Sequence, residues 1–376
     1  MQQEKTFLYH INVTKDCNLR CTHCYIHSDV KSASKSMTDE QIISIAYGIV
    51  EHMKKINYMR AEIYFIGGEP TMLGLDFFKR NIPIFNKIVK NAGFIAEVTI
   101  ATNLLHDDIV EIAKLFDKVM TSYEIQSRFI SSKGNYKPKL EQRWLENINK
   151  IQDIGIEVYV LVTITKPVIN YGARKILDYF YEKNIKKIHF SFFIPQGDGL
   201  INIKNMLPRF HETSNFLIDS ANWYLEKRDV DLNLWVNPFE SMLNAIDNNK
   251  TSNDIVCPII TGSLDINWDG NSATCYETGG STNPDWSGNI FETSIISVTS
   301  SKHFIKKVIE ASKPQKICRA CDEYDVCRSG CGVLFKFFDA NLDQDCPGFK
   351  KFIKFVRQKY EDGLKPRYAK YIGKNC

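Results

Sequence analysis

The sequence predicts an α/β fold: a partial barrel of six strand–helix units over residues 1–230, then a loop-rich domain over 231–376. In the first part, short runs rich in β-branched and aromatic residues alternate with longer amphipathic runs, as in parallel sheets buried on both faces. Six units in about 220 residues are too few for a complete eight-unit barrel, which takes about 250 residues. An open, doubly wound sheet stays the alternative, because periodicity alone does not separate the two.

The expected elements follow each other regularly along the chain. Thr38 begins a helix with Gln41 three residues later, as a capping box requires, and Gly93 and Gly155 stand where helices end. Strands are expected at 6–14, 61–67, 96–102, 118–124, 157–165 and 186–195. Helices are expected at about 38–55, 75–91, 106–116, 139–153, 170–183 and 208–227.

Beyond residue 230 the composition changes to frequent Asn, Asp, Gly and Ser, with few and short strand signals. A small loop-rich domain of this kind needs internal cross-links or metals to be stable. Its last segment, residues 349–376, is basic and partly amphipathic. It is interpreted as a terminal helix packed on the domain or as a docking surface for an acidic partner.

Composition and charge exclude several classes of protein. With 44% hydrophobic residues the chain can bury a core, and a net charge of +4 over 376 residues does not indicate nucleic-acid binding. The chain has no apolar run long enough to cross a membrane and no signal peptide, so a cytoplasmic location is expected. Thiols stay reduced there, and the eleven cysteines are therefore expected to bind metal.

Three of the cysteines lie in one short segment directly after the first predicted strand: Cys17, Cys21 and Cys24. Three thiolates on one loop can hold three irons of a cubane cluster and leave the fourth iron open to a small molecule. A structural zinc site would need a fourth ligand. His23 is available, but its position next to Cys24 is awkward for a shared tetrahedron.

The spacing C-x3-C-x2-C, followed by an aromatic residue, resembles the signature of the radical S-adenosylmethionine (radical SAM) enzymes. Gly67-Gly68-Glu69-Pro70, directly after the second predicted strand, matches the GGEP motif of that family, whose backbone and Glu bind the methionine amino group. Two glycines allow the main chain to approach a ligand closely, and a carboxylate pairs with an ammonium. The resemblance therefore implies that this turn binds the cofactor.

Further residues match the family at single positions. Asn103 follows Thr102 at the end of the third strand, where the family often reads T-N-G, although Leu104 replaces the glycine. Ser122 ends the fourth strand, where relatives have a serine that contacts the cofactor, and Tyr25 takes the aromatic position near the adenine. A simple strand-end cap is the alternative for Asn103 and Ser122.

The resemblance implies a fold, a cofactor and a reaction. The open iron of a [4Fe–4S] cluster binds S-adenosylmethionine, a reductant such as flavodoxin or ferredoxin supplies the electron, and a 5′-deoxyadenosyl radical abstracts hydrogen from the substrate. The protein's own task is then orientation and the exclusion of water. A non-catalytic iron–sulfur electron carrier is the alternative from another class, but a carrier does not need an aminoacyl-binding glycine turn.

A second group of cysteines is spaced as Cys257-x12-Gly270-x4-Cys275, then Cys318-x2-Cys321-x5-Cys327-x3-Cys331, then Cys346 after fourteen more residues. This spacing is similar to the SPASM extension of the family, which normally holds two auxiliary [4Fe–4S] clusters. A zinc ribbon is the alternative, but it needs two C-x2-C pairs and the chain has one. By the interleaved ligation of that extension, one cluster is held by Cys318, Cys321, Cys327 and Cys346, and the other by Cys257, Cys275 and Cys331.

The second of these clusters is one ligand short, unlike in relatives that have an additional upstream cysteine. Three explanations stay open. The fourth iron is open to substrate or solvent, Cys376 at the C-terminus supplies the ligand, or another residue type does.

Enzymes with this extension mostly modify peptides or proteins. The expected substrate is a ribosomally made precursor peptide, and the expected product is a three-residue cyclophane that joins an aromatic ring to a Cβ. A thioether-forming maturase and an anaerobic sulfatase maturase, which makes formylglycine, are the alternatives. Sixteen residues precede Cys17, so leader recognition is expected to use the barrel mouth, the C-terminal extension or a separate protein.

A catalytic base is expected if the reaction follows the sulfatase maturases. Glu124, after the fourth strand, and Asp198, in the segment PQGDG, are the candidates. For each of them a surface or strand-end carboxylate is the alternative.

Overall fold

The computed structural model describes residues 5–125, 127–130 and 135–367. The chain forms two compact units. The first consists of Met1–Leu161, Phe193–Leu207 and Pro258–Ser312, and the second of Val162–Phe192, Pro208–Cys257 and Lys313–Cys376. The domain boundary expected at residue 230 stays a prediction. Among the described residues, no helix has both the length and the apolar character needed to span a membrane.

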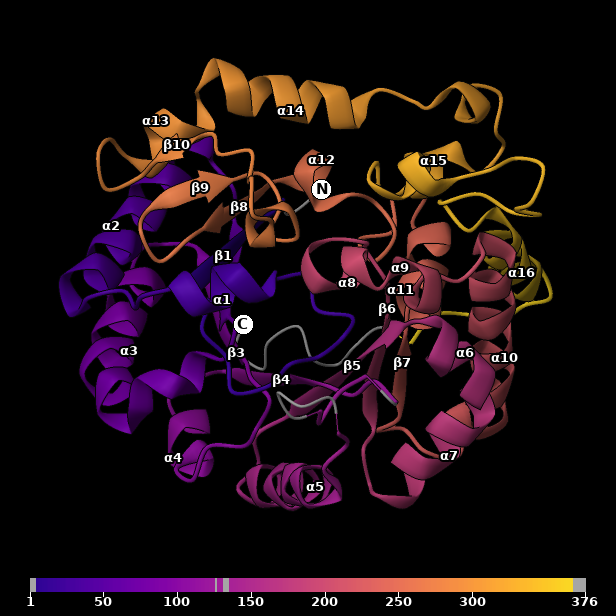
Figure 1. Cartoon of the computed structure of the whole chain (residues 1–376). Coiled ribbons are helices and arrows are strands. Elements are labelled where there is room, and N and C mark those ends of the chain that lie inside the picture. Colours follow the sequence, from indigo (N-terminus) through magenta and orange to yellow (C-terminus); the bar gives the residue numbers. More distant parts are fainter. Residues whose placement is uncertain (1–4, 126, 131–134, 368–376) are drawn as a thin grey trace. The chain divides into compact units, whose positions relative to one another are not determined.

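A sheet with a parallel centre forms the frame of the first unit (Figure 1). The strand order is β10-β9-β8-β1-β2-β3-β4-β5, parallel from β8 to β5, with β9 and β10 antiparallel. β8 pairs with β1 although about 250 residues separate them, and this pairing was not among the predicted elements. The strands are β1 (Thr6–Thr14), β2 (Arg60–Gly67), β3 (Ile95–Ala101), β4 (Lys118–Ser122), β5 (Val158–Ile164), β8 (Ser263–Ile266), β9 (Asn271–Ala273) and β10 (Gly288–Asn289).

One face of this sheet packs against amphipathic helices. Phe65 of β2 contacts Phe85 of α3 (Gly74–Lys90), and Tyr9 of β1 donates a hydrogen bond to His52 of α2 (Asp39–Ile56) or accepts one from it, at 2.6 Å. The capping box predicted at Thr38 begins α2. Figure 1 shows α2 and α3 side by side along the strands. Burial of these aromatic side chains is the main stabilising contribution on this face.

The other face of the sheet carries polar side chains, since successive residues of a strand point to opposite faces. His10 of β1 lies in register with Tyr64 of β2 and with Asp265 of β8. The His10 ring stacks on the Tyr64 ring with 5.4 Å between the ring centroids. The carboxyl ends of parallel strands meet at one edge of a sheet, so the loops after β1, β2, β3 and β4 are neighbours.

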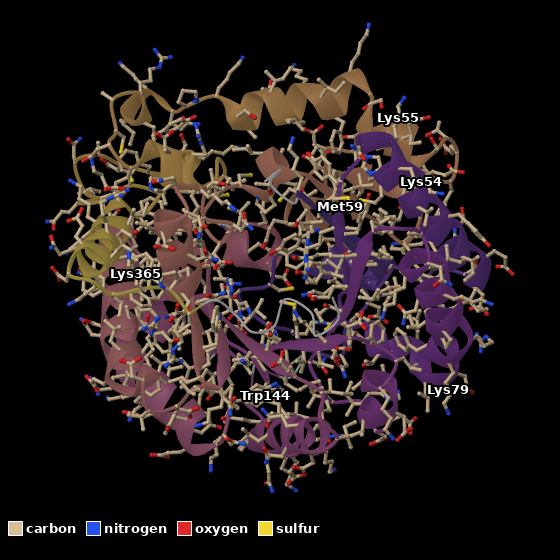
Figure 2. All side chains as sticks on the ribbon, turned by 180° about the vertical axis from the view of Figure 1, so that it is seen from behind. Lys54, Lys55, Met59, Lys79, Trp144 and Lys365 are labelled. Atoms are coloured by element: carbon tan, nitrogen blue, oxygen red, sulfur yellow. The ribbon has the colours of Figure 1, made fainter. Side chains whose placement is uncertain are left out.

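The other helices of the first unit are mostly short. On α5, Trp144 (labelled in Figure 2) is fully buried. Its indole N–H donates a hydrogen bond to Thr121 of β4 at 2.8 Å. The remaining elements are α1 (Ser28–Ala33), η1 (Pro70–Leu73), α4 (Ile109–Ala113), α5 (Pro138–Asp153), α8 (Gly197–Ile201), α9 (Ile203–Met206), α12 (Pro258–Thr261), η2 (Thr278–Gly280), α13 (Ile295–Thr299) and α14 (Lys302–Ser312).

The second unit joins a two-stranded parallel ladder to helices. Phe192, at the end of β6, stacks on Phe349 with 4.0 Å between the ring centroids. The last helix, α16, packs on α10 and α11, as the interpretation of a terminal helix predicts. The elements are β6 (Lys187–Phe192), β7 (Trp235–Asn237), α6 (Lys166–Tyr171), α7 (Ala173–Glu182), α10 (Phe210–Arg228), α11 (Phe239–Asp247), η3 (Lys316–Cys318), α15 (Tyr324–Cys327), η4 (Leu334–Phe337) and α16 (Lys350–Glu361).

Candidate metal centre and cofactor site

The loop between β1 and α1, residues 15–27, carries the first three cysteines and is called the cluster loop below. Cys21 is buried, and Cys17 and Cys24 are half-buried. Burial, Glu69 and the other two thiols raise the pKa of Cys17 to about 12, and burial also raises the pKa of Cys21 to about 11. The three sulfur atoms are therefore close enough to interact, and a bound metal must displace their protons.

Within the described residues, no three His, Cys, Asp or Glu side chains are arranged to bind a single metal ion. A zinc ion needs all its sulfur ligands within about 2.3 Å of one point. The thiolates of a cubane cluster bind different irons, so they stand farther apart. The chemistry of this donor set, three thiols on one loop, fits an iron–sulfur cluster better than it fits zinc.

The glycines of the GGEP turn bring β2 against the backbone of the cluster loop. Gly68 N donates to Thr14 O at 3.0 Å, and Glu69 N donates to Asp16 O at 2.8 Å. A Cβ on Gly68 would lie 2.1 Å from Asp16 O, and one on Gly67 would lie 1.9 Å from Thr14 O. Both positions require glycine because the chain itself approaches so closely. The turn thereby fixes the backbone that leads into Cys17 at the edge of the sheet.

Glu69 is buried and joins the ends of two strands. Its Oε1 accepts hydrogen bonds from the Thr71 hydroxyl and the Thr102 hydroxyl, both at 2.6 Å, and its Oε2 accepts one from Asn103 N at 2.7 Å. Pro70 follows at the start of η1. Most acceptor positions of this carboxylate are thus used inside the protein.

Asn103 connects the end of β3 to the cluster loop. Its Nδ2 donates to Asn18 Oδ1 at 2.7 Å, and its Oδ1 accepts from Leu105 N at 3.0 Å. Leu104, which stands where the family often has glycine, adopts a left-handed conformation with φ 60° and is fully buried. The backbone conformation that glycine favours is therefore kept, at a cost in strain.

The segment directly after Cys275 packs against the other end of the cluster loop. The Tyr25 ring meets the Tyr276 ring edge to face at 5.4 Å, and His27 N donates to Gly280 O at 3.0 Å. A Cβ on Gly280 or Gly197 would lie within 2.5 Å of Tyr25 O. These close backbone contacts fix the position of Tyr25, whose role beside the cofactor stays a prediction.

Ser122 ends β4, and Glu124 two residues later is buried in a charged network. Its Oε2 lies 2.8 Å from Arg128 Nε and 3.2 Å from His23 Nε2. Burial opposes ionisation of this carboxyl, but His23 and Arg128 hold its pKa well below its usual range. His23 Nδ1 also bonds Ser127 Oγ at 3.0 Å. Glu124 thus anchors the residue that precedes Cys24.

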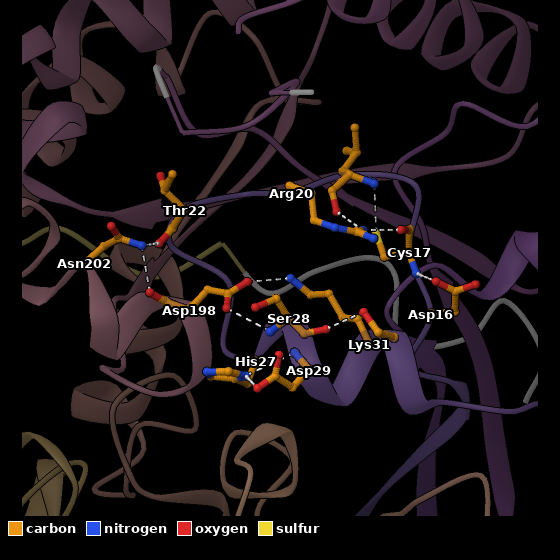
Figure 3. A network of polar contacts seen from close by, with 12 residues as sticks. Asp16, Cys17, Arg20, Thr22, His27, Ser28, Asp29, Lys31, Asp198 and Asn202 are labelled. Atoms are coloured by element: carbon orange, nitrogen blue, oxygen red, sulfur yellow. Dashed lines mark hydrogen bonds and ion pairs between the residues drawn. The ribbon is translucent and has the colours of Figure 1, made fainter. Parts of the chain in front are cut away.

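Asp198, at the first turn of α8, forms a second ion pair beside the cluster loop (Figure 3). Its Oδ2 lies 2.9 Å from Lys31 Nζ, and its Oδ1 accepts from Ser28 N at 2.9 Å. Burial lowers the pKa of Lys31, but Cys24 and Asp198 raise it by more. A buried cation therefore stands near Cys24, as Arg128 stands near Cys21.

Three buried polar residues were missed by the sequence analysis: Asn12 and Asp265 on the polar face of the sheet, and Lys15 at the start of the cluster loop. Asn12 Nδ2 donates to Asp265 Oδ1 at 2.6 Å, and both side chains are fully buried. Burial raises the pKa of Asp265 to about 6, although Lys15 and the bond from Asn12 oppose the shift. Lys15 is itself buried and donates to Gly279 O. Asn12 in a buried strand was the only sequence signal for them.

In the second unit, four cysteines lie together and are called the four-cysteine group: Cys318, Cys321, Cys327 and Cys346. Burial, with a smaller contribution from the other three thiols, raises the pKa of Cys327 to about 12. A Cβ on Gly348 would lie 3.1 Å from Cys327 Sγ and 3.8 Å from Cys346 Sγ. Four thiols in mutual range match the complete ligand set that a closed cluster needs.

The remaining expected ligands are distributed differently. Cys257 and Cys331 belong to the second unit and Cys275 to the first. Their common cluster stays a prediction, and Cys376 lies outside the described residues.

Comparison with known proteins identifies the first part of the chain. Residues 11–180 match the model of the Radical SAM superfamily. A cysteine-type anaerobic sulfatase-maturating enzyme of Clostridium novyi is 24% identical over an alignment of 375 positions, which covers 91% of this chain and 92% of the relative. An Fe-coproporphyrin III synthase of Methanosarcina barkeri is 25% identical over 57% of this chain, and the match spans about half (52%) of that relative's length.

Two solved structures share the fold. The structure of anSMEcpe with bound AdoMet has a TM-score of 0.74 at 18% identity and covers 96% of each chain. The structure of Streptococcus suis SuiB bound to its precursor peptide SuiA has a TM-score of 0.61 at 17% identity, over 90% of this chain and 75% of that chain. The predicted α/β fold with a parallel sheet is confirmed. The chain therefore contains a radical SAM domain over residues 11–180, within the fold that it shares with these enzymes.

Proposed function

We propose that this radical SAM enzyme abstracts a hydrogen atom from a ribosomally made precursor peptide. The observation that carries the proposal is the meeting of the three-cysteine loop, the GGEP turn and the ends of β3 and β4 at one edge of the sheet. Support for a peptide substrate comes from the similarity to sulfatase-maturating enzymes over nearly the whole chain and to SuiB, which was solved with its precursor peptide.

The cluster-loop residues Cys17, Cys21 and Cys24 would hold one [4Fe–4S] cluster. S-adenosylmethionine, bound at the iron that has no protein ligand, supplies the 5′-deoxyadenosyl radical. The turn Gly67-Gly68-Glu69-Pro70, with Tyr25, Asn103 and Ser122, would orient the cofactor. These residues come from four segments that the fold brings to one edge, and positioning of this kind is what the protein must contribute.

Glu124 and Asp198 would position the cluster loop rather than act as bases. Each carboxylate is paired with a cation, Arg128 or Lys31, and each is bonded to the loop or to the residue that follows it. A general base works best when its pKa lies near the operating pH. The pKa of Glu124 is held far below that range, so it is poorly suited to accept a proton from a substrate.

The four-cysteine group would hold a complete auxiliary [4Fe–4S] cluster, and Cys257, Cys275 and Cys331 a second one. None of the ten described cysteines takes part in a disulfide. We propose a cytoplasmic location, because reducing conditions keep such thiols available to metal. The fourth ligand of the second auxiliary cluster is then an open position, Cys376 or another residue.

The proposed product is an intramolecular crosslink between an aromatic ring and a Cβ, formed with the loss of two hydrogen atoms. Formylglycine formation is the second candidate, and the match to a cysteine-type sulfatase-maturating enzyme over 91% of this chain favours it. Mass spectrometry separates the two, since formylglycine replaces the cysteine thiol by an aldehyde, whereas a crosslink leaves every heavy atom in place.

The test begins with anaerobic reconstitution with iron and sulfide, followed by dithionite and S-adenosylmethionine. We expect 5′-deoxyadenosine, and its absence despite a loaded cluster would contradict the enzymatic proposal. Co-expression with the short peptides encoded beside the enzyme, and with a sulfatase peptide, then identifies the product by its mass and fragmentation.

A further inference from the structure

Lys31, on α1, is a lysine whose charged side chain is almost completely buried. Its Nζ lies 2.9 Å from Asp198 Oδ2, and the side chain of Asp198 is itself only 15% exposed (Figure 3). Removal of two charges from water is costly, and their mutual attraction does not always repay that cost. A lysine can usually keep its ammonium in water. The burial of Lys31 therefore indicates that its charge interacts with more than Asp198.

The segment that pairs with Lys31 also contacts the cluster loop at a proposed iron ligand. Directly after Asp198, Gly199 N donates a hydrogen bond to Cys24 O at 2.9 Å. Burial lowers the pKa of Lys31, but the Cys24 thiol, Asp198 and the Cys21 thiol together raise it above its usual value. The ammonium of Lys31 is thus within electrostatic range of two of the three thiols on the loop.

The position of the loop does not depend on the charge of Lys31. Asp198 Oδ1 accepts a hydrogen bond from Ser28 N at 2.9 Å, and Asn202 Nδ2 donates one to Thr22 O at 3.1 Å (Figure 3). These bonds hold the backbone on both sides of Cys24 and do not involve Lys31. A purely structural role therefore does not account for a buried cation at this place.

The negative charge of the loop changes when it binds a cluster. Each thiol gives up its proton to bind iron, so the loop becomes more negative, and reduction of the cluster adds one further negative charge. A cation close by stabilises the more negative, reduced state, and it does so more strongly in a buried site than in water. Charges near an iron–sulfur cluster are among the factors that set its reduction potential.

We propose that Lys31 raises the reduction potential of the [4Fe–4S] cluster assigned to the cluster loop, and that Asp198 limits this effect. The inference rests on the proposed function, because it concerns the cluster named there. In the reduction step the cluster accepts one electron, the reductant is oxidised by one electron, and no bond is formed or broken. Lys31 acts on this equilibrium through its charge.

Single substitutions separate the effect of charge from the effect of packing. Lys31→Met keeps a long unbranched side chain without the charge, and Lys31→Arg keeps the charge. Asp198→Asn removes the opposite charge and keeps an acceptor for Ser28 N. The matched controls are Lys114→Met and Glu111→Gln, because these two residues form an ion pair in the same unit with both side chains 49% exposed.

The measurement is the midpoint potential of the cluster in the whole chain, reconstituted anaerobically, titrated with dithionite and followed by electron paramagnetic resonance. The signal of this cluster is the one that Cys21→Ala removes. Lys31→Met should lower the potential by at least about 59 mV, which is a tenfold shift of a one-electron equilibrium. Asp198→Asn should raise the potential, and Lys31→Arg should stay near wild type. Both controls should leave it unchanged, because exposed charges are screened.

The direction of the shifts decides between charge and packing. Looser packing that admits water would move the potential in the same direction in Lys31→Met and Asp198→Asn, and this result overturns the proposal. A Lys31→Met potential equal to wild type also overturns it, as does a Lys31→Arg potential as low as that of Lys31→Met.

Two further outcomes keep the inference and the proposed function apart. If Lys31→Met binds no cluster, Asp198→Asn decides alone: a raised potential supports the proposal, and an unchanged or lowered one overturns it. If wild type has no signal that Cys21→Ala removes, the proposed function fails and the inference falls with it. The outcomes that overturn the role of Lys31 all require this signal, so they leave the proposed function standing.

Discussion

The cluster loop of the first unit and the four-cysteine group of the second unit hold their charges differently. Beside the cluster loop, the side chains of Lys31 and Glu124 are each 1% exposed, and their partners are largely buried. Beside Cys321, Asp322 pairs with Lys354 at 3.3 Å, with side chains 60% and 54% exposed, and the buried Glu323 pairs with the half-buried Arg357. Buried pairs are costly to break, whereas exposed pairs contribute little. The comparison predicts that substitutions in the ion pairs beside the cluster loop destabilise the protein more than substitutions in the pair of Asp322 and Lys354.

The two regions also differ in the number of cysteines that they contain. In the proposed assignment, the cluster loop would supply three cysteines and leave one iron of a cubane without a protein ligand, whereas the four-cysteine group would supply all four. An open position is needed where a cofactor binds, and a closed set suits a cluster with a structural or electron-transfer role. The two regions should therefore respond differently to the loss of one thiol.

The largest expected effect separates the two thiol sets. Cys21→Ala should abolish 5′-deoxyadenosine formation, because two thiolates do not retain the radical-generating cluster. Cys327→Ala should lower the iron content and stop product formation but leave dithionite-driven cleavage of S-adenosylmethionine measurable without peptide. Iron analysis and chromatography of 5′-deoxyadenosine check both variants. Complete loss of cleavage in a folded Cys327→Ala protein would break the assignment of separate roles.

The next effect concerns the buried network of Glu124. Glu124→Gln keeps the shape of the side chain but leaves Arg128 without its partner charge, which should lower the free energy of unfolding by about 3 kcal/mol. Arg128→Met in the same background should recover part of the loss, because it removes the unpaired charge. Asp322→Asn on the exposed side is the control and should leave stability unchanged within measurement.

Anaerobic urea unfolding measures these stabilities, and an activity assay separates the two roles of Glu124. If the Glu124→Gln protein is as stable as wild type and cleaves S-adenosylmethionine yet forms no product, Glu124 acts as the catalytic base instead. The expected result is instead that stability, cluster content and activity fall together.

Much of this organisation could be predicted from residue spacing. The cysteine motif and GGEP are local, and the strands at 6–14 and 118–124 lie within two residues of β1 and β4. Other features depend on contacts between distant residues and leave no local pattern. The pairing of β8 with β1 is one example. The buried network of Glu124, Arg128 and His23 is another, because His23 and the neighbouring Cys21 lie far from Glu124 in the sequence. From the sequence alone, Glu124 is therefore a candidate base or a strand-end carboxylate.

The glycines of GGEP show that a motif can be recognised from the sequence while one structural reason for its residues is not. The motif predicted a close approach of backbone to ligand, and the structure adds a close approach of Gly68 to Asp16 O. Likewise the helix expected at 170–183 is divided at Gly172, which has φ 99°. Periodicity continued across that glycine and did not indicate the break.

A third prediction compares a glycine from each region. Gly68→Ala places a Cβ 2.1 Å from the Asp16 carbonyl, which cannot move without shifting Cys17, and should cost about 3 kcal/mol of stability and reduce cluster occupancy. Gly348→Ala meets the Cys327 sulfur at 3.1 Å, and a side chain gives way more easily than backbone. We therefore expect a clearly smaller loss. Thermal unfolding and the visible absorbance of the clusters measure both, and equal losses would contradict the distinction.

The smallest expected effect tests Asp265, a buried carboxyl with no ion pair within the described residues. Its pKa is raised to about 6 in the folded protein, so between pH 5 and 7.5 the folded state binds more protons than the unfolded state. Stability must therefore fall as the pH rises through this window, by about 1.4 kcal/mol from this group. Asp265→Asn keeps the hydrogen bond with Asn12 possible and removes the titration.

The measurement is the difference in the free energy of unfolding between Asp265→Asn and wild type at the two pH values. The variant should gain about 1.4 kcal/mol relative to wild type on going from pH 5 to pH 7.5. Groups elsewhere titrate equally in both proteins and cancel in the difference. A constant difference would mean that Lys15 neutralises Asp265 fully, and Lys15→Met would then restore the dependence. The result decides whether Asp265 titrates as a buried carboxyl without a partner charge or forms an ion pair with Lys15. That pair would be the third buried ion pair beside the cluster loop, after those of Glu124 and Lys31.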